Sequence, residues 1–165
     1  MKRHSMRTIK RRRRERKTDY DARLKLLKGS LPRIVIRKTN RYIIAQLVES
    51  EKAQDSIICG ANSKELLKHG WEKAGSLKSI PACYLTGLLL GKKIKDKKKK
   101  VILDIGLFRN IKKSRIYAVL KGLVDSGLDI KFEEDIFPDE KRIKGEHLKN
   151  KIDFEKIKHK LMKNS

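Results

Sequence analysis

The sequence predicts an α/β domain in which helices pack on a mixed sheet, with a basic N-terminal arm before it and a helical C-terminal tail after it. Three short β-branched segments follow one another over residues 32–60, which predicts an antiparallel three-stranded meander. A similar segment, residues 101–105, lies between two predicted helices and predicts a later, parallel strand. The net charge of +24 is concentrated outside these segments, so the basic runs lie outside the core.

The charge divides the chain into a neutral body and basic appendages. Residues 1–41 carry +14 and residues 91–103 carry +6, whereas residues 42–90 are neutral. This distribution is typical of a protein that binds a phosphate backbone. We predict three parts: a basic RNA-binding arm with its anchoring helix (1–29), an α/β core domain (30–130) and a C-terminal helical tail (131–165).

The arm begins with four consecutive arginines, Arg11–Arg14, followed closely by Arg16 and Lys17. A folded core cannot hold such a run, because each buried charge needs a partner and few acids lie nearby. Guanidinium groups prefer planar oxygen acceptors, so phosphate is the natural partner. A disordered basic tail or a localisation signal is the alternative. The helix that follows, with Thr18 as its expected cap and Gly29 at its end, favours an arm that becomes ordered on a partner.

The meander is expected to comprise strands near residues 32–37, 42–48 and 56–60, with a second turn over residues 49–55. Thr39 and Asn40 predict the first turn. Basic residues frame this turn, and they are either a second phosphate contact or charged residues of a solvated hairpin tip; they are Arg37, Lys38 and Arg41.

The helices after the meander are predicted from caps and apolar spacing. Asn62 and Glu65 form a capping-box pattern for a short helix that ends at Gly70. Trp71 follows, and packing against the body is favoured over stacking on a base. A longer helix opens at Pro81 and reaches about residue 93, and its two glycines predict close approach to a neighbour.

Three predicted elements complete the chain. The lysine-rich run 92–100 is either a phosphate contact or a solvated linker. Ser114 caps a strongly amphipathic helix that ends before Gly127. In the tail, Pro138 marks a helix start, and residues 153–162 can form a last basic helix with Phe154 and two aliphatic residues on one side.

No catalytic pattern is convincing. Asp104 on a predicted strand, with acids downstream, suggests a metal-dependent nuclease as the alternative function, but the meander adds no inward carboxylate to complete a two-metal site. The four histidines have no ligand spacing, and no nucleotide-binding glycine loop occurs. Cys59 and Cys83 are expected to be reduced core thiols. No secretory signal or bilayer-length apolar stretch is present, so we expect a soluble, cytoplasmic protein that is not an enzyme and needs no cofactor or metal.

Six segments occur in order along the chain: RRRERKTDYDARL (12–24), PRIVIRKTNRYIIAQ (32–46), ACYLTGLLLGKK (82–93), LDIGL (103–107), GLVDSGLDI (122–130) and IFPDEKRIKGEHL (136–148). Together they resemble the large-subunit ribosomal protein family numbered eighteen in the universal nomenclature, the 5S rRNA-binding family. The likeness covers about residues 10–150, in order, and the short length favours an archaeal source. The lysine run at 92–100 is more basic than is usual in the family, and the helix after residue 151 has no evident counterpart.

The resemblance implies a structural constituent of the large ribosomal subunit. It implies that the protein binds 5S rRNA and helps to anchor it to 23S rRNA in the central protuberance, beside neighbouring large-subunit ribosomal proteins. Neither a membrane nor a small-molecule substrate is implied. Recognition would combine backbone neutralisation with the shape of the folded RNA. Tyr20 would either stack on a base or ribose or pack under its helix. The implied RNA-binding residues are Arg11, Arg12, Arg13, Arg14, Arg16, Lys17, Thr18, Tyr20, Arg23, Arg37, Lys38 and Arg41.

Overall fold

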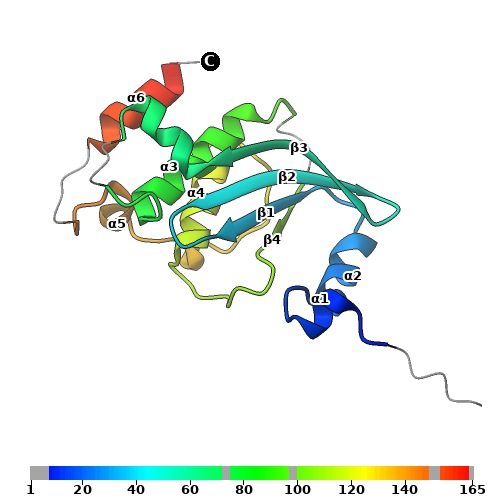
Figure 1. Ribbon diagram of the computed structural model, residues 1–165. Coiled ribbons are helices and arrows are strands. Elements are labelled where there is room, and N and C mark those ends of the chain that lie inside the picture. The colour runs from blue at the N-terminus through cyan, green and yellow to red at the C-terminus, as the bar shows by residue number, and fades with distance from the viewer. Residues whose placement is uncertain (1–7, 72–74, 97–99, 149–152, 164–165) are drawn as a thin grey trace, which may run out of the picture.

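The computed structural model describes residues 8–71, 75–96, 100–148 and 153–163. Figure 1 shows a twisted sheet with helices packed against it, and helices α1 and α2 at the opposite end of the molecule from α5 and α6. In chain order the elements are α1 (Arg11–Arg14), α2 (Tyr20–Lys28), β1 (Arg33–Lys38), β2 (Ile43–Glu51), β3 (Gln54–Asn62), the 3₁₀ helix η1 (Ser63–His69), α3 (Ile80–Lys93), β4 (Ile102–Asp104), α4 (Arg115–Asp125), the 3₁₀ helix η2 (Glu134–Ile136), α5 (Glu140–Lys144) and α6 (Phe154–Lys163).

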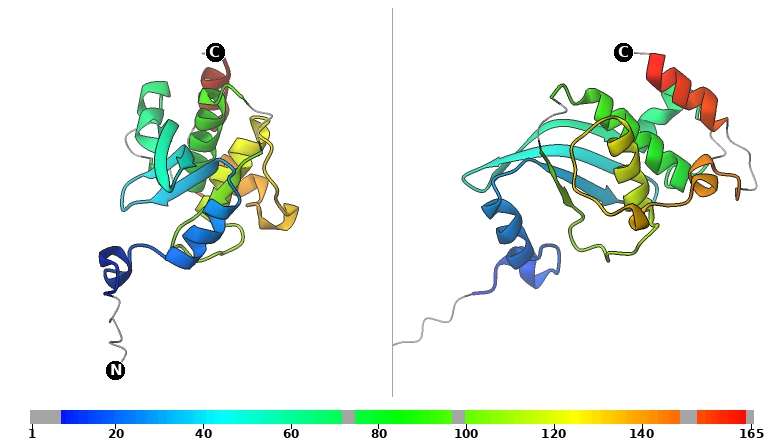
Figure 2. Two further views of the ribbon diagram at one scale, coloured as in Figure 1. Left: turned by 90° about the vertical axis from the view of Figure 1, so that its right-hand side faces the viewer. Right: turned by 180° about the vertical axis from the view of Figure 1, so that it is seen from behind.

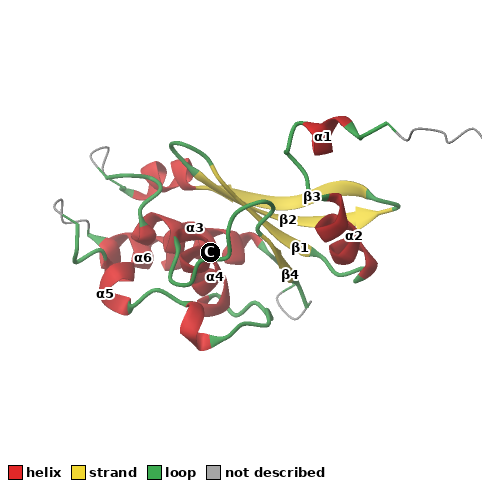
Figure 3. Ribbon diagram, turned by 90° about the horizontal axis from the view of Figure 1, so that it is seen from below, coloured by secondary structure: helices red, strands yellow, loops and turns green. Residues whose placement is uncertain are grey.

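The sheet confirms the predicted topology. Its strand order is β3-β2-β1-β4, with β1, β2 and β3 antiparallel and β4 parallel to β1. Figure 3 shows the four strands side by side with α2 near one end. The predicted turn over residues 49–55 was wrong, because the strands extend to Glu51 and from Gln54. Lys52 and Ala53 alone make the turn, both at positive φ (48° and 65°), as a tight two-residue hairpin requires.

The core lies between one face of the sheet and helices α3 and α4. Ile34 and Ile36 of β1 are fully buried in it, and 12 of the 14 residues of α3 are buried. The other face of β1 carries Arg33 and Arg37, because successive side chains point to opposite faces. Trp71 is also buried, at 2% exposure, which confirms that it packs on the body.

Helices α3 and α4 touch backbone to backbone, as the glycines of α3 predict. A Cβ on Gly87 would lie 2.1 Å from the carbonyl oxygen of Val119, and a Cβ on Gly122 would lie 2.2 Å from that of Tyr84. Further along, Gly91 lies against Ser126. Since Ile80 and Arg115, the first residues of α3 and α4, line the same cavity and Gly91 and Ser126 meet near their other ends, the two helices run in the same direction and begin at the same end.

The caps agree with the sequence at most helix ends. Asn62 and Glu65 form the predicted capping box, although the helix that follows, η1, is a 3₁₀ helix. The expected cap Thr18 was wrong: Asp19 caps α2, and its Oδ1 accepts from the backbone N–H groups of the second and third residues of the helix at 3.0 and 3.1 Å. Thr18 instead accepts a hydrogen bond from Arg12 Nε at 2.8 Å.

The two ends of the described chain lie far apart (Figure 2). At one end, α6 buries Phe154, Ile157 and Leu161, as the spacing of its apolar residues predicts. At the other end, the arm forms the short helix α1, where an arm without order of its own was expected. The chain turns sharply after this helix at Arg16, whose φ is +52°.

Candidate nucleic-acid interface

The arm presents its cations to solvent. None of the residues of α1 is buried. Glu15 lies 2.9 Å from Lys17 and 4.0 Å from Arg11, in exposed pairs that contribute little to stability. Arg14 and Arg16 make no ion pair with any residue that the structure describes. The arm therefore retains a positive charge that its own acids do not neutralise.

Tyr20 opens α2 and is half-buried. The ammonium group of Lys10 lies 4.5 Å from the centre of its ring, a distance at which the cation is attracted to the ring face. The ring is thus held between the arm and the first turn of the helix. This arrangement leaves both sequence interpretations of Tyr20, stacking on RNA and packing, open.

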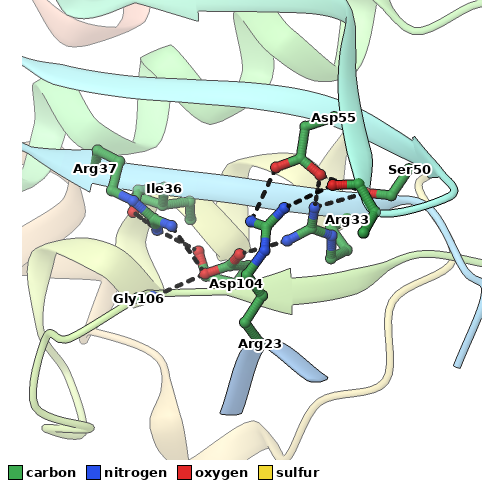
Figure 4. A network of polar contacts seen from close by, with 9 residues as sticks. Arg23, Arg33, Ile36, Arg37, Ser50, Asp55, Asp104 and Gly106 are labelled. Atoms are coloured by element: carbon green, nitrogen blue, oxygen red, sulfur yellow. Dashed lines mark hydrogen bonds and ion pairs between the residues drawn. The ribbon is translucent and has the colours of Figure 1, made fainter. Parts of the chain in front are cut away.

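A chain of alternating charges ties α2 to the sheet (Figure 4). Arg23 of α2 lies 3.0 Å from Asp55 of β3, and Asp55 in turn lies 2.7 Å from Arg33 of β1. Arg33 also donates to Asp104 of β4 at 3.0 Å, and Asp104 accepts from Arg37 at 3.0 Å. Only 2% of the Arg33 side chain is exposed, so this guanidinium depends on its partners for its solvation.

The remaining polar atoms of this network are satisfied locally. The hydroxyl of Ser50 donates to Asp55 at 2.6 Å and accepts from Arg33 at 2.8 Å. Burial raises the pKa of Asp55, but hydrogen bonds from Arg23 and Ser50 and the charges of the two arginines outweigh it, so the pKa lies below its ordinary value of 3.8. Asp55 therefore holds its negative charge at the centre of the network.

The hairpin cations differ in how freely they face solvent. Arg37 is 40% exposed, yet its guanidinium also donates to the backbone carbonyls of Ile36 and Asp104. The ammonium group of Lys38 lies 5.3 Å from the ring centre of Phe108. Arg41 is exposed and has no ion-pair partner in the described ranges. Of the implied contacts, Arg23 and Arg37 are thus fixed by internal bonds, whereas Arg41 is free to reach outward.

The structure brings five of the twelve implied contacts to one groove. A cavity of about 590 Å³ lies between the arm, α2 and the loop after β4. Its lining includes Arg12, Lys17, Thr18, Arg23 and Arg37. These residues come from two parts of the chain, the arm with α2 and strand β1, and the loop after β4 forms the rest of the lining. The groove therefore brings together part of the sequence-based list of RNA contacts.

The sequence reading missed a second basic segment, the loop between β4 and α4. Residues 107–115 carry four cations and no acid. Two of them form exposed pairs with the tail, Lys112 with Asp135 at 2.6 Å and Lys113 with Asp139 at 3.0 Å. When net charge is summed over long blocks of sequence, the acids of residues 125–146 cancel the charge of this segment and hide it. Net charge summed over a window of about ten residues would have found it.

The first two lysines of the run at 92–100 have neither of the two expected roles, phosphate contact or solvated linker. The ammonium group of Lys92 donates to the backbone carbonyl of Leu161, which fastens α6 to the end of α3. Lys93 donates to Glu65 at 2.6 Å and to the carbonyl of Gly60 at 2.8 Å. Lys92 and Lys93 therefore connect elements of the body, while residues 97–99 lie outside the described residues.

The carboxylate that suggested a nuclease, that of Asp104, is taken up by hydrogen bonds and ion pairs within the protein. Asp104 accepts from two guanidinium groups and from the backbone N–H of Gly106 at 2.8 Å. In the described part of the chain, no three His, Cys, Asp or Glu residues gather where they could hold a metal ion. Among the helices that the structure describes, none combines the length and apolar character needed to cross a membrane.

Comparisons with known proteins show which family this chain resembles. A family model described as "Ribosomal large subunit proteins 60S L5, and 50S L18" matches residues 2–101 and 92–133. The chain is 51% identical over 139 residues to the large ribosomal subunit protein uL18 of Korarchaeum cryptofilum, covering 84% of this chain and 70% of that protein. It is 50% identical over the same length to the uL18 proteins of Methanoregula boonei and Methanoculleus marisnigri, covering 84% of this chain and 79% and 78% of those proteins.

Proposed function

Since the chain belongs to the family of ribosomal large-subunit proteins 60S L5 and 50S L18, we propose that it binds 5S rRNA and helps to anchor it to 23S rRNA in the central protuberance. The family and its archaeal members identify the chain as a structural protein of the large ribosomal subunit of the archaeal type, and not an enzyme. The 5S and 23S partners, the central protuberance and contacts with neighbouring ribosomal proteins are the finer part of the proposal.

The observation that carries this proposal is the groove between the arm and the loop after β4. Its cations come from an exposed arm and from arginines that acids hold in fixed positions. Fixed cations cost little side-chain entropy when they meet phosphates, and exposed cations release counterions. The combination suits a folded RNA whose backbone presents phosphates at defined positions.

We assign the RNA contacts on this basis to two groups. The exposed group neutralises phosphates, and the fixed group sets the position of the RNA relative to the sheet. The exposed group comprises Arg11, Arg12, Arg13, Arg14, Arg16, Lys17, Lys38 and Arg41, and the fixed group comprises Thr18, Tyr20, Arg23 and Arg37.

The test is binding to 5S rRNA compared with an unrelated structured RNA of equal length, at several salt concentrations. We expect a clear preference for 5S rRNA. Replacing Arg12, Arg13 and Arg14 by alanine removes up to three phosphate contacts, so the log–log salt dependence should flatten by about 2 to 3.

A matched control removes three cations from the far end of the molecule, Lys156, Lys160 and Lys163 on α6. This control should leave both the preference for 5S rRNA and the salt dependence unchanged. Equal affinity for the two RNAs would mean that the protein binds RNA only as a non-specific polycation. An unchanged salt dependence in the arm variant would mean that the arm does not contact the RNA backbone.

A further inference from the structure

A second cavity, of about 690 Å³, lies where helices α3 and α4 begin. The two helices run in the same direction and their first residues, Ile80 and Arg115, both line it. A helix N-terminus carries a partial positive charge and backbone N–H groups without intrahelical partners. Two such ends side by side repel each other, and an anion placed between them removes the repulsion.

Two serine hydroxyls at this place have no partner. Ser79 and Ser114 are the N-cap residues of α3 and α4, and neither side chain accepts the hydrogen bond that a capping serine usually takes from its helix. Both Oγ atoms are buried and lack any hydrogen-bond partner within the described structure, and Ser79 is only 8% exposed. A buried hydroxyl without a partner costs about 1–3 kcal/mol, so an anion that accepts hydrogen bonds from both hydroxyls would remove this cost.

The rest of the lining has one sign of charge. Its ionisable residues are Lys38, Arg109, Lys113, Arg115, Arg142 and His147, and none of the carboxylates that the structure describes belongs to the lining. They come from the hairpin, the loop before α4 and the segment around α5. Gly145 at the end of α5 holds this segment close to α3, because a Cβ there would lie 2.9 Å from Pro81 Cγ. The cavity is therefore complementary to an anion that can accept several hydrogen bonds.

The position of the cavity identifies the source of this anion. Leu107 and Phe108 line both this cavity and the groove beside the arm, so the two basic surfaces adjoin at these residues. Phe108 also carries Lys38 on its ring. A strand that lies in the arm groove can continue over Phe108 and place its next phosphates in the second cavity.

We propose that this cavity binds a backbone phosphate of rRNA, whose oxygens accept hydrogen bonds from the hydroxyls of Ser79 and Ser114, from the N–H of Ile80 and from the first N–H groups of α4. The second residue of α3, Pro81, has no N–H to donate. The surrounding cations neutralise the phosphate. The inference rests on the proposed function for the identity of the RNA, but the site itself is separate from the arm. It extends the RNA-binding surface from the arm to the helix ends.

The decisive variant is the double substitution Ser79→Ala and Ser114→Ala. Removing two unpaired hydroxyls should leave the thermal stability of the free protein unchanged or slightly raised, because no internal hydrogen bond is lost. Affinity for 5S rRNA should fall about tenfold or more, because each hydroxyl donates to a charged group in the complex. The salt dependence should not change, because the substitutions remove no charge. Ser56→Ala on the exposed strand β3 is the matched control and should change none of these quantities.

A second variant keeps the test valid if the alanine protein does not fold. Arg109 lies on an exposed loop, and Arg109→Gln should weaken binding and flatten the salt dependence by about 1. Unchanged 5S affinity in both variants, with the wild type still preferring 5S rRNA, would overturn the inference while the proposed function stands.

Inorganic phosphate tests the site without RNA. At equal ionic strength, phosphate should raise the unfolding temperature of the wild type more than chloride does, and this difference should shrink in the serine variant. If 5S rRNA binding fails in the wild type but this difference is seen, the proposed function fails and the anion site remains. A phosphate effect that depends on the serines, combined with unchanged RNA affinity, would overturn the assignment to RNA.

Discussion

Replacing Asp104 by asparagine perturbs the buried charge network at its most sensitive point. The network contains three arginines and two aspartates, so its formal charge is +1, and the substitution raises it to +2. One carboxylate oxygen also becomes an NH₂ group. Whichever way the amide turns, its NH₂ faces a donor, either Arg33 on one side or Arg37 and the N–H of Gly106 on the other.

The expected loss follows from the burial of Arg33. Breaking a buried ion pair costs about 3–5 kcal/mol because it leaves a charge uncompensated. Arg33 keeps its bonds to Asp55 and Ser50, so we expect about 3 kcal/mol, at the lower end. For a chain of this length, that loss lowers the unfolding temperature by about 6–12 °C.

The loss of stability is measured by urea denaturation and calorimetry and is compared with that of two further variants. Asp135→Asn removes the same group from an exposed pair with Lys112 and should not shift the midpoint. Arg33→Met makes the network neutral and leaves each aspartate one arginine, so it should cost less than Asp104→Asn. The reasoning is refuted if Asp104→Asn behaves like Asp135→Asn, or if Arg33→Met is the more damaging change.

Two further predictions concern the same body. Gly122→Ala should cost about 3 kcal/mol or prevent folding, because its Cβ would lie 2.2 Å from the carbonyl oxygen of Tyr84, which is backbone and cannot move aside. Gly60→Ala is the control in chemical denaturation, because its Cβ would lie 3.3 Å from the flexible side chain of Gln46 and at an ordinary contact distance, 3.7 Å, from the carbonyl oxygen of Ala45. Since the folded-state pKa of Asp55 lies below 3.8, its contribution to stability is present above that value and is lost as the pH falls through the folded pKa. Asp55→Asn should therefore flatten the acid side of the stability curve measured by thermal unfolding, and an acid side identical to that of the wild type would contradict this account.

Local signals in the sequence were enough to predict the sheet topology and most helix ends. The capping box at Asn62 and Glu65, the glycines of α3 and the amphipathic spacing of α4 depend on residues within one or two turns of each other. The cap of α2 was misplaced by one residue because Thr18 and Asp19 are both good caps. Only the three-dimensional structure shows that the Thr18 hydroxyl is taken by Arg12.

The network and the second cavity could not be predicted, because their parts are distant in the sequence. Arg33 lies 22 residues from Asp55 and 71 from Asp104, and an arginine at the start of a strand gives no sign that it is buried. Lys92 and Lys93 resembled a solvated run until their acceptors on other elements were known. Ser114 was predicted as the cap of α4, but Ser79 was not identified as the cap of α3, and the missing hydrogen bonds of both serines are visible only in the fold.

The backbone contact between α3 and α4 has a consequence for discrimination among RNAs. Because the backbones of α3 and α4 are in direct contact at Gly87 and Gly122, the distance between the first turns of the two helices is already fixed in the free protein. The phosphate-binding groups at the two helix starts are therefore held at a fixed separation. An RNA strand whose phosphates already have the matching spacing binds without deformation, whereas a strand that must bend to fit loses affinity by the free energy of bending. The selectivity for one folded RNA over another would then depend on two glycines that never touch it.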